Sequence, residues 1–349
     1  MAFLMNAWYC AAWTEELETE DRFARKLLGK SVLIFKKQDG TYGAIGNACP
    51  HRFAPLNKGP REGDTFICPY HGLEFDTNGR CTRNPNEGGT IPRAARVPSY
   101  PLVERDSALW IWMGDPKKAD LDLIPDFSMI RAREGWNVVR GHHVTKANYE
   151  LVMDNLMDRT HVQFLHPLLK LMGEQPENFQ RIQSVEQIGN MIWDYHGEVN
   201  CTKYPLLDAL WPEAPDIVEN YFDVRWEAPS NMLLNAGTVE VGTNREVGVH
   251  LPMSNLLTPA DEFSTHYFWS QARDKNIGRE EMDEMIKAGV AHTFQNEDGE
   301  MVADCMEMMG TNDLMRLNPV MLPGDAAAVR ARRILSSMIA AEQAEAGLV

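Results

Sequence analysis

Cys49-Pro-His-Arg52 and Cys68-Pro-Tyr-His-Gly72 are two short segments that decide how the first part of this 349-residue chain folds. Sixteen residues separate His51 from Cys68, and each segment offers one thiolate and one imidazole. Two Cys on one iron and two His on the other form the ligand set of one type of [2Fe–2S] cluster. Structural zinc is the alternative, but zinc sites usually pair Cys with Cys and His with His at short spacing. The pattern therefore predicts a [2Fe–2S] cluster held by Cys49, His51, Cys68 and His71.

The residues on either side of these segments favour an all-β module. Residues 31–35 and 108–112 are apolar runs of strand length, and Asn78-Gly79 is a turn dipeptide. A chain of 349 residues exceeds what one core usually serves, so two domains are expected. The polar, proline-containing stretch 116–125 marks the boundary. We expect a cluster domain over 1–118 and a second domain over 119–349.

The second domain has a different pattern of apolar residues, with longer strands and long helices. Alternating apolar patterns over 185–250 and 262–272 predict antiparallel strands, while 279–309 and 325–346 have the spacing and composition of long helices. The expected fold class is α+β: an N-terminal all-β domain, followed by an α+β domain whose antiparallel sheet is flanked by helices.

A second metal-binding pattern is Asp158-Arg-Thr-His161, followed by His166 and Pro167. Two His and one carboxylate with open coordination positions form the facial triad of non-haem Fe(II) oxygenases. His161 and His166 lie roughly 140° apart on an ideal helix, so the helix must bend or end between them for both to bind one ion. Pro167 favours such an end. A histidine pair alone is a weak signal, because core and surface histidines are more common.

Together, the two patterns resemble those of the Rieske non-haem iron oxygenases, in the terminal oxygenase component. The resemblance implies that Cys49 and Cys68 bind one iron of the cluster, His51 and His71 bind the other, and His161 and His166 bind a mononuclear Fe(II). In the family, subunits form a head-to-tail homotrimer. Asp158 would then be a catalytic bridge that joins His71 of one subunit to His161 of the next.

The resemblance places the third iron ligand late in the chain, within Asn296-Glu-Asp-Gly299. We choose Asp298 as the ligand and keep Glu297 as the alternative. A solvated acidic helix face would give the same pattern. Asn155 is a further catalytic candidate that would hold Asp158 or a water, with helix packing as the other explanation.

The resemblance extends over nearly the whole chain and is closest to the branch that includes vanillate O-demethylase and dicamba monooxygenase. It implies a monooxygenase that uses O₂ for oxidative dealkylation of a small aromatic substrate, by O-demethylation or N-dealkylation. Hydroxylation of a methyl group or ring, or cis-dihydroxylation of an aromatic acid, is the alternative. The resemblance suggests Asn235, His266 and Trp269 as substrate contacts, although core packing explains such residues equally well.

Composition limits the partners. A net charge of −16 disfavours nucleic acid, and no apolar stretch is long enough for a membrane span. No basic and apolar leader segment opens the sequence, so a cytoplasmic location is expected. The chain contains no Gly-x-Gly-x-x-Gly dinucleotide fingerprint and no ferredoxin cysteine run. We therefore expect a separate reductase or ferredoxin to supply electrons.

Overall fold

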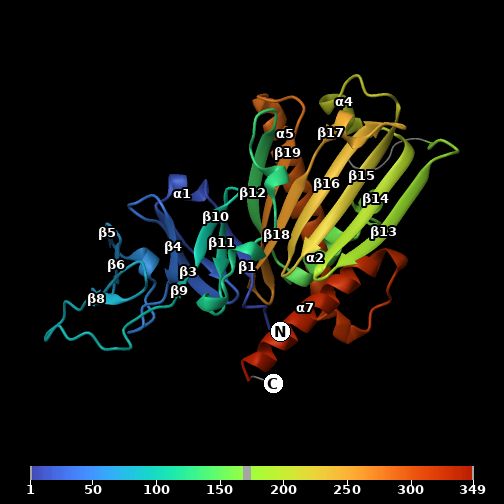
Figure 1. The fold of residues 1–349 in the computed structure, drawn as a ribbon. Helices are drawn as coiled ribbons and strands as arrows, with labels where there is room; N and C mark the ends of the chain where they lie inside the picture. The colour runs from blue at the N-terminus through green and yellow to red at the C-terminus, as the bar shows by residue number, and fades with distance from the viewer. Residues whose placement is uncertain (1, 168–173, 348–349) are drawn as a thin grey trace. The chain divides into compact units, whose positions relative to one another are not determined.

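The computed structural model describes residues 2–167 and 174–347, and the chain divides into two compact units (Figure 1). One unit comprises Met5–Ile124 with Thr258–Asp261, and the other comprises Met1–Leu4, Pro125–Leu257 and Glu262–Val349. The predicted domain boundary at 118/119 stays a prediction.

The unit that begins at Met5 is built from three antiparallel sheets. The first has the order β1 (Trp8–Trp13), β11 (Ala108–Trp112), β10 (Leu102–Arg105); the second β2 (Arg22–Leu27), β3 (Lys30–Lys36), β4 (Tyr42–Gly46), β9 (Ser99–Tyr100); the third β5 (Arg61–Glu62), β6 (Thr65–Ile67), β7 (Glu74–Phe75), β8 (Cys81–Arg83). Cys49 and Cys68 are buried in one apolar cluster with Phe35, Phe66 and Phe75. The cysteine loops are therefore anchored in the core of this unit.

The other unit is built on an eight-stranded antiparallel sheet. Its order is β12 (Asn137–Thr145), β19 (Ser264–Arg273), β18 (Met253–Asp261), β16 (Asn231–Glu240), β15 (Ile217–Glu227), β14 (Met191–Thr202), β13 (Gln180–Ile188), and β17 (Val249–His250) pairs with β16. Its helices include α2 (Tyr149–Met157), α3 (Val162–Leu165), α4 (Pro205–Leu210), α5 (Glu280–Ala291), α6 (Asp298–Met309) and α7 (Ala326–Glu345). The predicted α+β fold class is confirmed. Among the described residues, no helix has the length and apolarity needed to cross a bilayer.

The helix predicted over 279–309 is interrupted. A π-helical turn, His292–Glu297, separates α5 from α6. A π turn contains one more residue than an α turn, and it leaves no clear mark on apolar periodicity. It sets the direction in which Asp298, the first residue of α6, projects.

Helix α2 is joined to α7 by a buried cation. Arg332 of α7 forms a 2.7 Å ion pair with Asp154 and a 2.5 Å ion pair with Glu150, both in α2. The Arg332 side chain is only 6% exposed, so losing one carboxylate would weaken the compensation of a buried charge and losing both would remove it. This network fixes the helix that leads directly into the Asp158–His166 segment.

Candidate metal centres

The two cysteine loops have the same backbone hydrogen-bonding pattern. The Cys49 carbonyl accepts from the Phe53 N–H at 2.8 Å, and the Cys68 carbonyl accepts from the Gly72 N–H at 3.0 Å. Phe53 and Gly72 both have positive φ, of 58° and 72°. At Gly72 a Cβ atom would lie 2.8 Å from the Pro85 ring, so this position requires glycine both for space and for conformation. Each loop thus forms a tight turn that brings one thiol and one imidazole to the same place.

The four donors of these loops fit a cluster with two different iron environments. Both thiols are buried, while the His51 and His71 rings lie further out, with their Nδ1 atoms 3.1 Å apart. Burial, together with the adjacent Cys68 thiol, raises the pKa of the Cys49 thiol to about 11. Two neighbouring thiolates in an apolar core need positive iron to stay deprotonated. The donor set therefore fits a [2Fe–2S] cluster.

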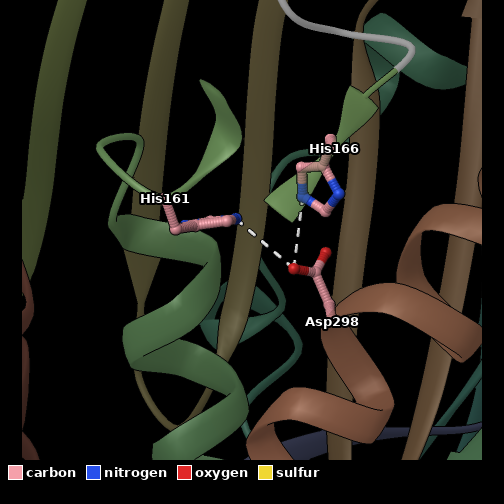
Figure 2. A group of neighbouring side chains, drawn as sticks. All are labelled: His161, His166 and Asp298. Atoms are coloured by element: carbon pink, nitrogen blue, oxygen red, sulfur yellow. Dashed lines mark ion pairs between the residues drawn. The ribbon is translucent and has the colours of Figure 1, made fainter. Parts of the chain in front are cut away.

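His161, His166 and Asp298 form a second group of possible metal ligands (Figure 2). Oδ1 of Asp298 lies 3.3 Å from Nε2 of His161 and 3.2 Å from Nε2 of His166. Helix α2 ends at Met157, and the short helix α3 lies between the two histidines, at its N-cap and C-cap. Both imidazoles can therefore face one point, although an unbroken helix would keep them apart. The Asp298 side chain is 6% exposed and that of His166 is 3% exposed.

Each histidine has a different carboxylate behind it. Nδ1 of His166 is 2.8 Å from Oε2 of Glu297, and Nδ1 of His161 is 3.6 Å from Oδ2 of Asp158. A carboxylate at the far nitrogen of a metal-binding histidine fixes its tautomer and increases its basicity. Glu297, the alternative for the third ligand, thus faces the rear of His166 and not the shared point. The Asn155 side chain donates to Oδ1 of Asp298 at 3.0 Å, and its backbone carbonyl accepts from the Asp158 N–H at 3.2 Å.

The neighbouring charges shift the pKa values of the triad residues strongly. Burial by itself lowers the pKa of His161, but the carboxylates of Asp158 and Asp298 raise it to about 9. Burial opposes ionisation of Asp298, yet the two imidazoles and Asn155 lower its pKa to about 2. Two imidazoles and one ionised carboxylate, converging on one point, match the donor set that non-haem Fe(II) prefers.

Residues 7–101 match the Rieske [2Fe–2S] domain, and residues 145–341 match the vanillate O-demethylase oxygenase C-terminal domain. The chain belongs to the Rieske non-haem iron oxygenases. This confirms the resemblance inferred from the sequence. The two donor sets described above fit the [2Fe–2S] cluster and the mononuclear iron of this family.

This oxygenase is similar in sequence and fold to known proteins over almost its whole length. It is 36% identical to the oxygenase component of chloroacetanilide N-alkylformylase from Rhizorhabdus wittichii, over 97% of each chain. It is 35% identical to the oxygenase component of dicamba O-demethylase from Stenotrophomonas maltophilia, over 99% of this chain and 100% of the other. Its fold matches dicamba monooxygenase bound to 3,6-dichlorosalicylic acid with a TM-score of 0.88 and 34% identity, over 99% and 100% of the two chains.

The three predicted substrate residues of this oxygenase do not share one face of the sheet. Tyr267 faces the triad, because its ring lies 5.3 Å from Phe294 in the π-helical turn. Side chains alternate between faces along a strand, so Trp269 lies on the same face as Tyr267, whereas His266 lies on the other.

Strand pairing also places Asn235 on the face away from the triad. Its neighbour Leu234 pairs with Met253, so these two side chains lie on the same face. Met253 is two residues before Asn255 and shares its face, and Oδ1 of Asn255 accepts from the Tyr267 hydroxyl at 2.7 Å. Leu234 therefore shares the face of Tyr267, and Asn235 has the opposite orientation. The structure does not bring Asn235 or His266 to the triad's side of the sheet.

The structure gives two residues of this oxygenase, Glu297 and Arg159, positions that the sequence did not predict. Glu297 was considered only as a ligand, and its position behind His166 depends on the π-helical turn. Arg159, between Asp158 and His161, lies over the Phe222 ring of β15. The sequence shows a basic residue inside the metal-binding motif, which was the only sign that Arg159 is unusual. The orientation of its side chain could not be predicted, because it depends on the position of the sheet.

Proposed function

We propose that this chain is the terminal oxygenase of a system that oxidatively dealkylates a substituted aromatic compound by O-demethylation or N-dealkylation. The observation that carries this proposal is the His161–His166–Asp298 triad, in a chain that is similar over its full length to an O-demethylase and an N-alkylformylase. One oxygen atom of O₂ enters a C–H bond next to the heteroatom, and the other leaves as water with two electrons and two protons. The hydroxylated product then breaks down to an aldehyde and the dealkylated compound.

The two donor sets have separate tasks in this proposal. When bound, the cluster supplies single electrons and the mononuclear iron supplies the site for O₂ chemistry. Because the triad offers only three protein ligands, a bound iron would still be open to O₂ chemistry beside the substrate. The cluster ligands are Cys49, Cys68, His51 and His71, and the iron ligands are His161, His166 and Asp298.

Three neighbouring side chains position the iron ligands. Glu297 holds the His166 ring through Nδ1, and Asn155 holds Oδ1 of Asp298. Asp158 stays ionised, because the His161 imidazole 3.6 Å away and hydrogen bonds from the Thr160 N–H and hydroxyl lower its pKa to about 2 although burial opposes this. An ionised Asp158 beside His161 is suited to bridge to His71 of a neighbouring subunit, as the family's head-to-tail homotrimer would require.

The chain needs a partner that delivers electrons. Its relatives are named as oxygenase components, which implies a separate reductase or ferredoxin. We place the system in the cytoplasm, where NAD(P)H can supply that partner.

Coupled turnover tests the function. The purified protein, loaded with both metals, is given a generic Rieske reductase, NADH and a panel of methoxy-, N-alkyl- and methyl-substituted aromatics. Aldehyde released in step with O₂ uptake would support dealkylation. A phenol, benzyl alcohol or diol formed without aldehyde would contradict it and assign hydroxylation instead.

A further inference from the structure

Arg159 reaches from the metal motif onto the sheet. Its guanidinium carbon lies 3.6 Å from the centre of the Phe222 ring in β15. The residue is only partly accessible, and it lies directly between Asp158 and Thr160 in the chain. The side chain therefore extends inward over an aromatic ring and not outward to solvent.

Phe222 lies on the same face of the sheet as Tyr267, which is the face turned toward the triad. Phe222 and Trp226 are four residues apart in β15, so they share one face. Trp226 pairs with Met232, and Met232 pairs with Asn255, so these three side chains lie on one face. The Asn255 side chain accepts a hydrogen bond from the Tyr267 hydroxyl, so Tyr267 lies on that face as well. Arg159 and the triad thus lie on the same side of the sheet.

Two carboxylates of this face attract Arg159 electrostatically, those of Glu198 and Asp194, and both already have other partners. Oε2 of Glu198 accepts from the Tyr204 hydroxyl at 2.8 Å, and its Oε1 lies 3.4 Å from Nε of Arg181. Asp194 lies 2.9 Å from Nε2 of His196 and accepts from Gln183 at 3.1 Å. Both acids are therefore held by other side chains of the sheet and of the segment beside it.

The Arg159 guanidinium lacks such a partner. Within residues 2–167 and 174–347 it forms no hydrogen bond or close ion pair. Its guanidinium stacks on the Phe222 ring, and the carboxylates of Glu198 and Asp194 attract it only over longer distances. A desolvated cation that no anion contacts directly is costly, and the face of a ring compensates for only part of that cost. Arg181 and Arg332, by contrast, both meet carboxylates.

We propose that Arg159 binds the acid group of an anionic aromatic substrate, a carboxylate or a sulfonate. This inference rests on the proposed dealkylase function and names its substrate class. The planar guanidinium fork matches two oxygens of such a group, and stacking on Phe222 fixes the plane of the fork. The bound acid would supply the direct ion pair that Arg159 lacks, while the ring of the substrate lies on the triad's side of the sheet.

Equilibrium binding tests the inference without turnover. Anaerobic calorimetry on the protein loaded with both metals would compare three probes: methoxybenzoates, methylbenzenesulfonates and uncharged methoxybenzamides, each as the 2-, 3- and 4-isomers. The variants are Arg159→Gln and Arg159→Lys. Arg181→Gln is the matched control, because it removes a guanidinium of the same face that already has a carboxylate partner.

At least one anionic isomer should bind the wild type about 10- to 100-fold more tightly than its amide, as expected for a hydrogen bond to a charged group. Arg159→Gln should abolish this preference, Arg159→Lys should keep part of it, and Arg181→Gln should retain it. Equal affinity for acids and amides, an unchanged preference in Arg159→Gln, or no binding of any anion would overturn the inference.

Aldehyde release, measured on the same samples with reductase, separates the two proposals. Selective binding of acids without aldehyde would support the anion site and contradict dealkylation. Aldehyde from neutral compounds, with no preference for acids, would support dealkylation and overturn the role of Arg159.

Discussion

Both imidazoles of the triad point Nε2 at Asp298 and Nδ1 at a second carboxylate. The two acidic neighbours in sequence, Glu297 and Asp298, are thereby separated in function, because one faces the rear of His166 and the other faces the shared point. At the scale of single residues, adjacent positions with the same charge should respond very differently to substitution.

Replacing Asp298 with Ala should remove the mononuclear iron, whereas Glu297→Gln should retain it with affinity lowered about 10- to 100-fold, as for other carboxylates behind a ligand. Iron analysis after dialysis against a graded chelator measures both. The cluster absorption spectrum is the control and should be unchanged. Equal iron loss in the two variants would contradict the distinction.

The elevated pKa of His161, about 9, makes iron binding compete with a proton. Affinity for Fe(II) should rise roughly tenfold per pH unit between about pH 6 and pH 8, because binding displaces this proton. Anaerobic Fe(II) titration of the iron-depleted protein measures the dependence. In that protein the folded pKa exceeds the unfolded value, so the stability from His161 is fully present below about pH 6.5 and is lost as the pH rises through about 9. An affinity independent of pH would refute this reasoning.

The element that decides the third ligand is the π-helical turn between α5 and α6. Because it adds one residue to a turn, it rotates Asp298 by roughly 100° from the direction that a continuous α-helix would give. The sequence identified Asp298 as a candidate, but helical periodicity could not show this rotation.

Deleting Asn296 should restore an α-helical turn, redirect Asp298 and remove most of the mononuclear iron. Far-UV circular dichroism and the cluster spectrum should remain close to wild type. Asn296→Ala, which keeps the length of the turn, is the matched control and should bind iron normally. Iron retained in the deletion variant would show that the turn does not set the geometry of the ligand.

The limits of sequence reasoning lie at the same scale. The Cys49 and Cys68 segments predicted the cluster loops, since their donors lie close together in the chain. Asn235 and His266 were expected at the substrate, yet strand register turns them to the other face. Register depends on pairing between distant strands, so one residue of offset in a resemblance reverses the orientation of a side chain.

At the scale of the whole molecule, the proposed electron path runs between subunits. Co-expression of two inactive variants tests it. Cys68→Ser lacks the cluster but retains Asp158, while Asp158→Asn retains both metals but lacks the bridge. In random head-to-tail trimers, about a quarter of the interfaces would join an intact cluster to an intact bridge.

Co-expressed subunits should therefore recover roughly a quarter of the wild-type turnover per iron. Mixing the two purified variants without exchange of subunits is the control and should give none. If electrons passed within one subunit, the co-expressed pair would be as inactive as either variant alone.

The ligands of the two metal centres are spread very differently along the chain. The cluster donors lie within residues 49–71, whereas the iron site needs residues from 161 to 298, and α2 also needs Arg332 of α7. Since a chain emerges from the ribosome from its N-terminus, the cluster loops are complete long before the iron site is. The four cluster donors are therefore synthesised well before Asp298, and the iron site can form only after most of the chain has been made.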